Sequence, residues 1–506
     1  MTGHRTFSDP PTTSGPSADP SAADPLRPRE RTLLLLTTLG TIMAAVDTTI
    51  VILALPTMAR DLAAPLETII WTILIYLLIA AALTTQAGRV GDLLGRGRVY
   101  NAGFAVFTIG SALCGFAPSA GWLVAARGVQ AIGGAVMVAN AGALIADVFP
   151  PHRRGRAFGF VSFGWSIGAI LGILLGGVIT TAIGWRYIFF INLPIGVLAV
   201  VLGWFTLPRG QRQPVRFDLP GFAVFSTALV LICYGAIEIA SYGLRAAYLG
   251  YELGGLALLA VFVLVELRAA APMLDLRQLR DRLLGFSLIA GFCQSVGFLS
   301  VVFLLTLYLQ GVRGLSPLNA SLLLIPGYLV GAIVGPTMGR WVDRFGPRGL
   351  ATLGILLMTV AVVLYSFLRV GSWLGYVPMI SAVGGVGTGM FFPANNTAVM
   401  SRATPSSFGS VSGLRGTLAN MGTLLSFVLT LTIASASVPR YVAYQVFLGS
   451  SIPTALGGSF LSGIHAALYG SAATLLLAAA LSWSRGRSPA PRIRGGVTPT
   501  GASGKP

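Results

Sequence analysis

The segment GRVGDLLGRGR, residues 88–98, joins two apolar stretches and is rich in glycine and arginine. A related segment, GRWVDRFGPR, occupies residues 339–348. Four residues of the first segment recur with the same spacing in the second. They are Gly88, Arg89, Asp92 and Gly95, which correspond to Gly339, Arg340, Asp343 and Gly346. Because one charged turn occurs twice between apolar stretches, we expect a helical unit that is repeated along the chain.

The composition places this helical unit in a membrane. The chain has 506 residues, of which 54% are hydrophobic and only 10% are charged, whereas soluble domains carry about 25% charged residues. Fourteen apolar segments lie between Leu33 and Trp483, and each is long enough to cross ~30 Å of hydrocarbon as a helix. The sequence predicts an all-α polytopic membrane protein with 14 transmembrane helices.

The basic residues predict the orientation of the chain. The net charge is +18, but the arginines lie in short loops, where they set topology rather than bind nucleic acid. With the N-terminus inside, 26 basic residues fall on the cytoplasmic side and five on the other. We therefore expect both termini in the cytoplasm and a multi-pass protein of the plasma (inner) membrane.

Several classes of site are excluded or not expected. The only lysine, Lys505, is followed by Pro506, so no GxxxxGK[ST] phosphate loop exists in this sequence. The chain has three histidines and no HExxH zinc motif, and we expect no enzyme activity, cofactor or metal. Cys114, Cys233 and Cys293 lie in apolar segments and are expected to be buried thiols without a disulfide.

The repeat also predicts the domain organisation. Both charged turns fall on the cytoplasmic side, and eight spans separate them. A six-helix repeat then requires two inserted helices, and internal repeats of this kind are a known transporter design. We expect two pseudo-symmetric six-helix bundles with an insert, in this order: a disordered cytoplasmic tail at 1–31, an N-terminal bundle at 32–206, an insert at 207–284, a C-terminal bundle at 285–484 and a disordered cytoplasmic tail at 485–506.

Four further motifs follow in order along the chain: VDTTIVILALP at 46–56, RGVQAIGGA at 127–135, GAILGILLGG at 168–177 and WRYIFFINLPIG at 185–196. Together with the charged turns, they resemble the fourteen-span drug:proton antiporter branch of the major facilitator superfamily. Two positions depart from the pattern, because Ile52 replaces an asparagine and Ile173 replaces the proline of the antiporter motif. The glycines Gly168, Gly172, Gly176 and Gly177 are kept, which favours close helix packing.

Asp47 and Arg127 are the candidates for proton coupling. An acid deep in an apolar span is a functional candidate by default, although a structural hydrogen bond to a neighbouring group is the alternative. Arg127 is close enough to the outer surface to extend towards it, but its depth also lies within reach of Asp47. The resemblance implies that this arginine takes part in proton coupling.

The charged turns are candidates for a gate. Glycines there permit a tight turn, Asp92 is expected to meet a helix N-terminus of the other half, and Arg89, Arg96 and Arg98 are expected to face acidic headgroups. Anchoring at the membrane surface is the alternative, and it explains the arginines but not Asp92. The resemblance implies that this turn stabilises the outward-facing state.

Other polar residues within spans are weaker candidates for a cavity lining or a proton relay. They are Gln130, Asn140, Glu238, Gln294, Asn395, Asn396, Asn420 and His465. Glu238 and His465 lie near outer helix ends, where an interfacial or structural role is the alternative. The segment GMFFPANN at 389–396 predicts a broken or flexible twelfth span.

The sequence favours a secondary transporter that exports small lipophilic or amphiphilic molecules, such as drugs or antibiotics, in exchange for protons by alternating access. Its expected partners are a small-molecule substrate, protons and the lipid bilayer, and we expect a monomer. Export of one endogenous metabolite or peptide is the alternative within this class. A membrane enzyme or sensor is the alternative outside it, and it leaves the duplicated turn unexplained.

Overall fold

A computed structural model describes residues 27–208, 217–269, 272–401, 408–436 and 454–486. Within these ranges all regular secondary structure is helical. The N-terminal half comprises α1 (Pro28–Asp61), α2 (Leu66–Leu94), α3 (Arg96–Gly115), α4 (Ala120–Val148), α5 (Pro151–Ala182), α6 (Tyr187–Phe190) and α7 (Asn192–Thr206).

The insert comprises α8 (Leu219–Tyr242) and α9 (Ala246–Arg268). A short 3-10 helix, η1 (Leu276–Arg280), leads into the C-terminal half. That half comprises α10 (Arg282–Phe298), α11 (Val301–Thr306), the π-helix η2 (Leu307–Val312), α12 (Pro317–Phe345), α13 (Pro347–Tyr365), α14 (Tyr376–Met400), α15 (Phe408–Ala436) and α17 (Thr454–Ser484).

The membrane-spanning character predicted from composition is confirmed. In the described part of the chain, 13 helical segments are long and apolar enough to cross a bilayer. They include α6 with α7 as one crossing and α10 through η2 as another. α3 is less apolar but has 20 residues, a length of about 30 Å, and it makes the fourteenth crossing.

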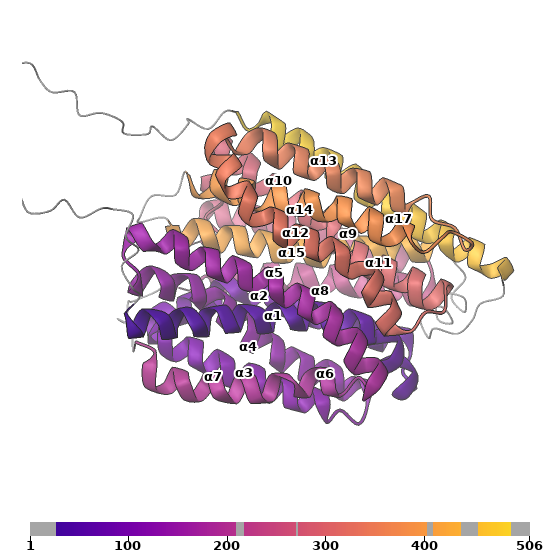
Figure 1. Cartoon of the computed structure of the whole chain (residues 1–506), viewed down its shortest axis with the longest axis horizontal. Helices are drawn as coiled ribbons and strands as arrows, with labels where there is room; N and C mark the ends of the chain where they lie inside the picture. The colour runs from indigo at the N-terminus through magenta and orange to yellow at the C-terminus, as the bar shows by residue number, and fades with distance from the viewer. Residues whose placement is uncertain (1–26, 209–216, 270–271, 402–407, 437–453, 487–506) are drawn as a thin grey trace, which may run out of the picture.

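The two halves lie side by side, with the N-terminal half below and the C-terminal half above in the view of Figure 1. α5 packs against α12, and α2 packs against α15. The helices of the insert pack on each other, and α8 contacts both α2 and α15. The insert therefore touches both halves. The division of the chain into domains at 207 and 285 remains a proposal.

Helix continuity differs from the sequence prediction at one place. The twelfth span, α14, is one continuous helix despite Pro393, so the predicted break is wrong. A proline inside a membrane helix is tolerated because neighbouring helices and hydroxyl groups can satisfy the backbone carbonyl that it frees. Breaks occur instead at Ile191, between α6 and α7, and between α10 and α11.

Candidate functional site

The centre of the N-terminal half holds a buried ion pair. Asp47 of α1 is fully buried and Arg127 of α4 is 2% exposed. The Arg127 Nη1 lies 2.7 Å from Asp47 Oδ2. A buried charge of either sign is strongly destabilising when its partner is missing, so each of these residues stabilises the charged form of the other.

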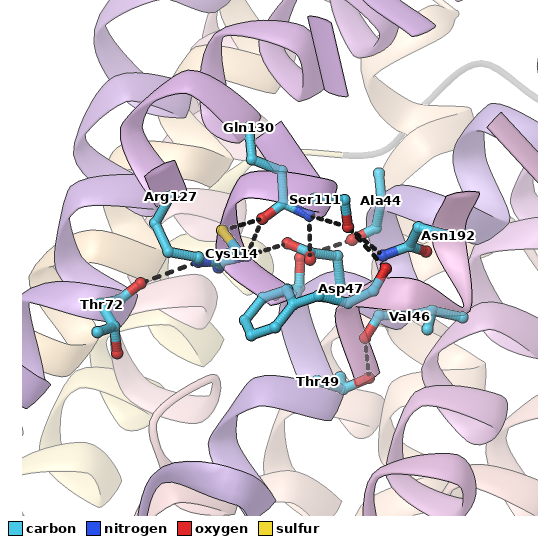
Figure 2. Close-up of polar contacts among 12 residues, drawn as sticks. Ala44, Val46, Asp47, Thr49, Thr72, Ser111, Cys114, Arg127, Gln130 and Asn192 are labelled. Carbon is cyan, nitrogen blue, oxygen red and sulfur yellow. Dashed lines mark hydrogen bonds and ion pairs between the residues drawn. The ribbon is translucent and has the colours of Figure 1, made fainter. Parts of the chain in front are cut away.

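Gln130, one turn after Arg127 on α4, completes the hydrogen bonds of the pair (Figure 2). Its Nε2 donates to Asp47 Oδ1 at 2.8 Å, and its Oε1 accepts from Arg127 Nη1 at 2.7 Å. The amide therefore binds both ions at once. Neither carboxylate oxygen of Asp47 is left without a donor.

Ser111 of α3 extends this network to a third and a fourth helix. Its Oγ accepts from Gln130 Nε2 at 3.2 Å and from Asn192 Nδ2 at 3.0 Å, and it donates to the Phe189 carbonyl. Asn192 is the first residue of α7, directly after the break at Ile191. The broken sixth span thus places an amide in the network. Apart from the WRYIFFINLPIG motif, no sequence pattern marks this contact.

The remaining surroundings of Arg127 are aromatic and backbone groups. Its Nε donates to the Thr72 carbonyl of α2 at 3.1 Å, and its guanidinium lies 4.4 Å from the centre of the Tyr76 ring. A cation over an aromatic face is stabilised further when water is excluded. Arg127 therefore joins α1, α2 and α4, and it does not extend to the outer surface.

Glycines of α5 let this helix approach α1 beside Asp47. A Cβ at Gly168, Gly172 or Gly176 would meet the backbone of α1 between Ile42 and Ile50 at 2.7–3.1 Å. The fourth glycine, Gly177, faces the other half, because a Cβ there would lie 2.3 Å from Ser321 Oγ of α12. Small residues at such positions allow close backbone contact in membrane helices.

The first charged turn is built around a glycine and an arginine. Gly95 has φ of 103°, and Gly346, its counterpart in the second turn, has φ of 78°, a region that side chains other than glycine rarely adopt. Arg96 bonds Asp92 Oδ1 through Nε and Asp147 Oδ1 through Nη1, both at 2.7 Å. In the structure Asp92 thus pairs within its own half, instead of with a helix N-terminus of the other half.

The other residues of the turns have different surroundings. Gly91 packs against Asn140, whose Nδ2 donates to the Ala87 carbonyl at 3.1 Å, and Gly88 lies beside α4. Arg89 donates to the Pro272 carbonyl, in the segment after α9. Arg89 and Arg96 are half-buried, and of the three arginines only Arg98 is exposed. The surroundings of Gly339 and the side chains of Arg340 and Asp343 lie outside what the structure describes.

Two of the polar candidates in the C-terminal half lie near the end of the helical body at which α17 ends. Asn395 donates to the Ser287 carbonyl at 3.2 Å and accepts from Arg485 Nη1 at 3.0 Å. Burial, together with the charge of Arg348, lowers the pKa of Arg485 to about 10, so the arginine stays charged at neutral pH. Asn396 accepts from Arg415 Nη1 at 3.0 Å, which shows that Arg415 has a partner inside the bundle.

Asn420 is the candidate that reaches the other half. Its Nδ2 donates to Thr84 Oγ1 of α2 at 3.2 Å, and Thr417 on the same helix bonds Thr85 at 2.6 Å. Gln294 is buried against the Met358 sulfur at 3.6 Å. His465 bonds the Leu368 carbonyl at 2.8 Å, and Glu238 is half-buried on α8. Gln294, His465 and Glu238 have no hydrogen bond to the Asp47 network among the contacts of the described residues.

A small apolar cavity of about 10 Å³ lies between the two halves. It is lined only by aliphatic and phenyl side chains: Leu55 of α1, Ile70, Ile73 and Leu74 of α2, Phe303 of α11, and Phe427 and Leu431 of α15. Ile73 and Leu74 directly follow Thr72, whose carbonyl accepts from Arg127. A cavity of about 10 Å³ has room for roughly one water molecule, so in this conformation it offers no space for a substrate.

Comparison with known proteins is consistent with this architecture. Residues 37–427 match the family model of the Major Facilitator Superfamily. The chain is 31% identical over 421 residues to the tetracenomycin C resistance and export protein of Streptomyces glaucescens, covering 82% of this chain and 78% of that protein. It is 29% identical to the riboflavin transporter RibZ of Clostridioides difficile, covering 82% and 89%.

A solved structure shares the fold. A bacterial homologue of the human lysosomal transporter Spinster, in an inward-facing and unoccupied conformation, superposes with a TM-score of 0.62 at 20% identity. The alignment covers 91% of this chain and 98% of that one.

Proposed function

Because this chain belongs to the Major Facilitator Superfamily, we propose that it exports small lipophilic or amphiphilic compounds in exchange for protons by alternating access. The family and its drug-efflux relatives make the chain a multi-pass membrane transporter rather than an enzyme. The Streptomyces glaucescens relative is a tetracenomycin C resistance and export protein, which supports the direction and the class of substrate.

The observation that carries proton coupling is the Asp47–Arg127–Gln130 network. The ion pair favours the charged carboxylate while Arg127 is close, and a dry environment favours the neutral acid once Arg127 has moved away. A change of conformation that separates α1 from α4 would therefore exchange a proton. Such a change requires two states with different affinities for the proton.

The apolar pocket supports the substrate class. The side chains that line it offer no hydrogen-bond partner and suit contact with hydrocarbon or ring surface, but the cavity measures only about 10 Å³. A substrate between these side chains would require the two halves to move apart. The pocket draws residues from both halves, and a movement of one half against the other would change its shape. A substrate bound between the separated halves would bias the same conformational equilibrium as the proton.

The orientation and assembly belong to this proposal as well. We place both termini in the cytoplasm and the protein in the plasma membrane as a monomer. The start of α1 and the end of α17 lie at the same end of the helical body in Figure 1. The excess of basic residues at that end supports its cytoplasmic position.

The test is transport by the purified protein in liposomes with an imposed pH gradient, acidic inside. We expect the wild type to accumulate a fluorescent lipophilic dye, and Asp47→Asn to fall to the level of protein-free liposomes while still binding the dye. Glu67→Gln, a change at the outer end of α2, is the matched control. Accumulation by Asp47→Asn would place the proton site elsewhere, with Glu238 or His465 next to be changed.

Transport of a single endogenous metabolite is the second candidate, and the riboflavin transporter of Clostridioides difficile favours it. A panel of unrelated dyes, antibiotics and riboflavin separates the two functions. Export of several unrelated compounds supports a multidrug function. Export of one compound, with no competition from the others, supports a dedicated transporter.

A further inference from the structure

The segment Pro272–Leu274, which follows α9, is held by two buried acids. Glu266, near the end of α9, is 1% exposed, and Asp218, which caps α8, is 7% exposed. The Met273 N–H donates to Asp218 Oδ2 at 3.3 Å and to Glu266 Oε1 at 3.2 Å. The Leu274 N–H donates to Glu266 Oε2 at 3.2 Å.

The side chains of this segment are buried too. Met273 and Leu274 are each 3% exposed and belong to the hydrophobic core. A Cβ at Gly221 would lie 2.4 Å from Asp218 Oδ2 and 2.9 Å from Glu266 Oε1. Because glycine has no side chain, both carboxyl groups have space at this position. The segment is therefore fixed by its backbone and by its side chains.

The carbonyl of Pro272, the first residue of this fixed segment, accepts a hydrogen bond from Arg89. Arg89 lies in the last turns of α2, one turn before the Asp92–Arg96 pair. On the same helix, Thr84 and Thr85 bond Asn420 and Thr417 of the C-terminal half. The insert thus contacts the cytoplasmic end of α2 close to where α2 meets α15.

We propose that the insert positions the cytoplasmic gate, with Asp218 and Glu266 holding the 272–274 segment as a strap to which Arg89 attaches α2. This inference rests on the proposed alternating-access transport. The strap stabilises the arrangement in which α2 and α15 are in contact. Removal of the hydrogen bond from Arg89 to the Pro272 carbonyl shifts the population away from that arrangement, because this charge-assisted bond stabilises only the state in which α2 and α15 are in contact.

The test measures the conformation directly and needs neither a substrate nor a pH gradient. Thr417→Cys is introduced into full-length protein in which Cys114, Cys233 and Cys293 are replaced by alanine, and its rate of alkylation is followed in liposomes. We expect Arg89→Ala to raise the rate about tenfold, the shift expected when one hydrogen bond to a charged group is lost. Arg89→Lys, which keeps a cationic donor, should restore most of the slow rate.

A double-mutant cycle tests whether the arginine acts through the strap. Glu266→Ala removes the acceptors of the Met273 and Leu274 N–H groups and should also raise the rate. If both residues act through one strap, the double variant reacts no faster than the faster single variant. Glu266→Gln replaces Glu266→Ala if the latter does not fold.

Arg268→Ala is the matched control, because Arg268 is an exposed arginine at the end of α9. The proposal is overturned if Arg89→Ala leaves the rate unchanged, if the two single effects multiply in the double variant, or if Arg268→Ala has the same effect as Arg89→Ala. A failure of proton-driven transport alone would contradict the proposed function. The alkylation rates would still test whether the strap holds α2, because they need neither a substrate nor a pH gradient.

Discussion

Arg127 donates to a carboxylate, an amide oxygen and a backbone carbonyl from one guanidinium. An ammonium group carries the same charge but lacks the planar fork that serves several acceptors at once. We therefore expect Arg127→Lys to retain part of the pH-driven accumulation and Arg127→Ala to abolish it, measured in the liposome assay. With alanine, Asp47 stays buried without a counterion and is driven to its neutral form.

The informative result is whether Arg127→Lys retains more pH-driven accumulation than Arg127→Ala. A merely structural arginine would give equal losses with lysine and alanine, together with lower yields of folded protein for both. Gel filtration of each variant in detergent provides the folding control. Wild-type accumulation by Arg127→Ala would show that the pair has no part in coupling.

At the scale of elements, the turn between α2 and α3 depends on a shared arginine. Arg96 bridges Asp92 of α2 and Asp147 of α4, so it fixes the end of α2 against α4. Asp92→Asn weakens one of the two ion pairs and should reduce transport while the protein still folds and inserts. Transport rates normalised to the amount of inserted protein measure this, and a rate equal to that of the wild type would reduce the turn to a surface anchor.

The contact between α1 and α5 permits a second test at this scale. A Cβ at Gly172 would lie 2.0 Å from Thr49 Oγ1 and 2.7 Å from the Val46 carbonyl. Gly172→Ala should therefore destabilise the protein by about 1–3 kcal/mol through overpacking, seen as a lower melting temperature in detergent. Gly254→Ala on α9, where a Cβ meets nothing within 4 Å, should leave the melting temperature unchanged.

The helices and the depth of Asp47 could be predicted because apolar length and charge position are properties of the linear sequence. The contacts could not, since a sequence gives the depth of a residue along its helix but not the direction of its side chain or the neighbouring helix. Asp92 illustrates this, because its partner Arg96 lies four residues away on the same segment. Thr72 contributes only a carbonyl to the site, and no side-chain pattern marks such a contribution.

The insert shows the same limit more clearly. Asp218 and Glu266 occur near the ends of two apolar helices, where an acid is expected to face water. Only the fold shows that both are buried and bind one backbone segment. Likewise, a proline motif predicted a break in α14, which is continuous. The helices break instead at Ile191, three residues before Pro194, and in the ninth span between α10 and α11.

At the scale of the whole molecule, the duplicated turns define the symmetry. Gly95 and Gly346 each end a long helix with a positive φ, and each is followed directly by the next helix. The number of crossings between the turns decides whether they share one side of the membrane. α3 through α12 provide eight crossings if α3 spans, and seven if it does not.

α3 is therefore the element on which the topology depends, because it is the least apolar of the crossings. Its 20 residues suffice for about 30 Å of hydrocarbon, and its burial against α4 compensates for lower hydrophobicity. Leu94→Cys and Phe345→Cys place exposed thiols at the two turns, since the native side chains are 49% and 63% exposed. We expect an impermeant maleimide to label neither thiol in intact cells and both in inside-out vesicles. Labelling of one thiol from each side would show that an odd number of helices separates the turns and would contradict the fourteen-span fold.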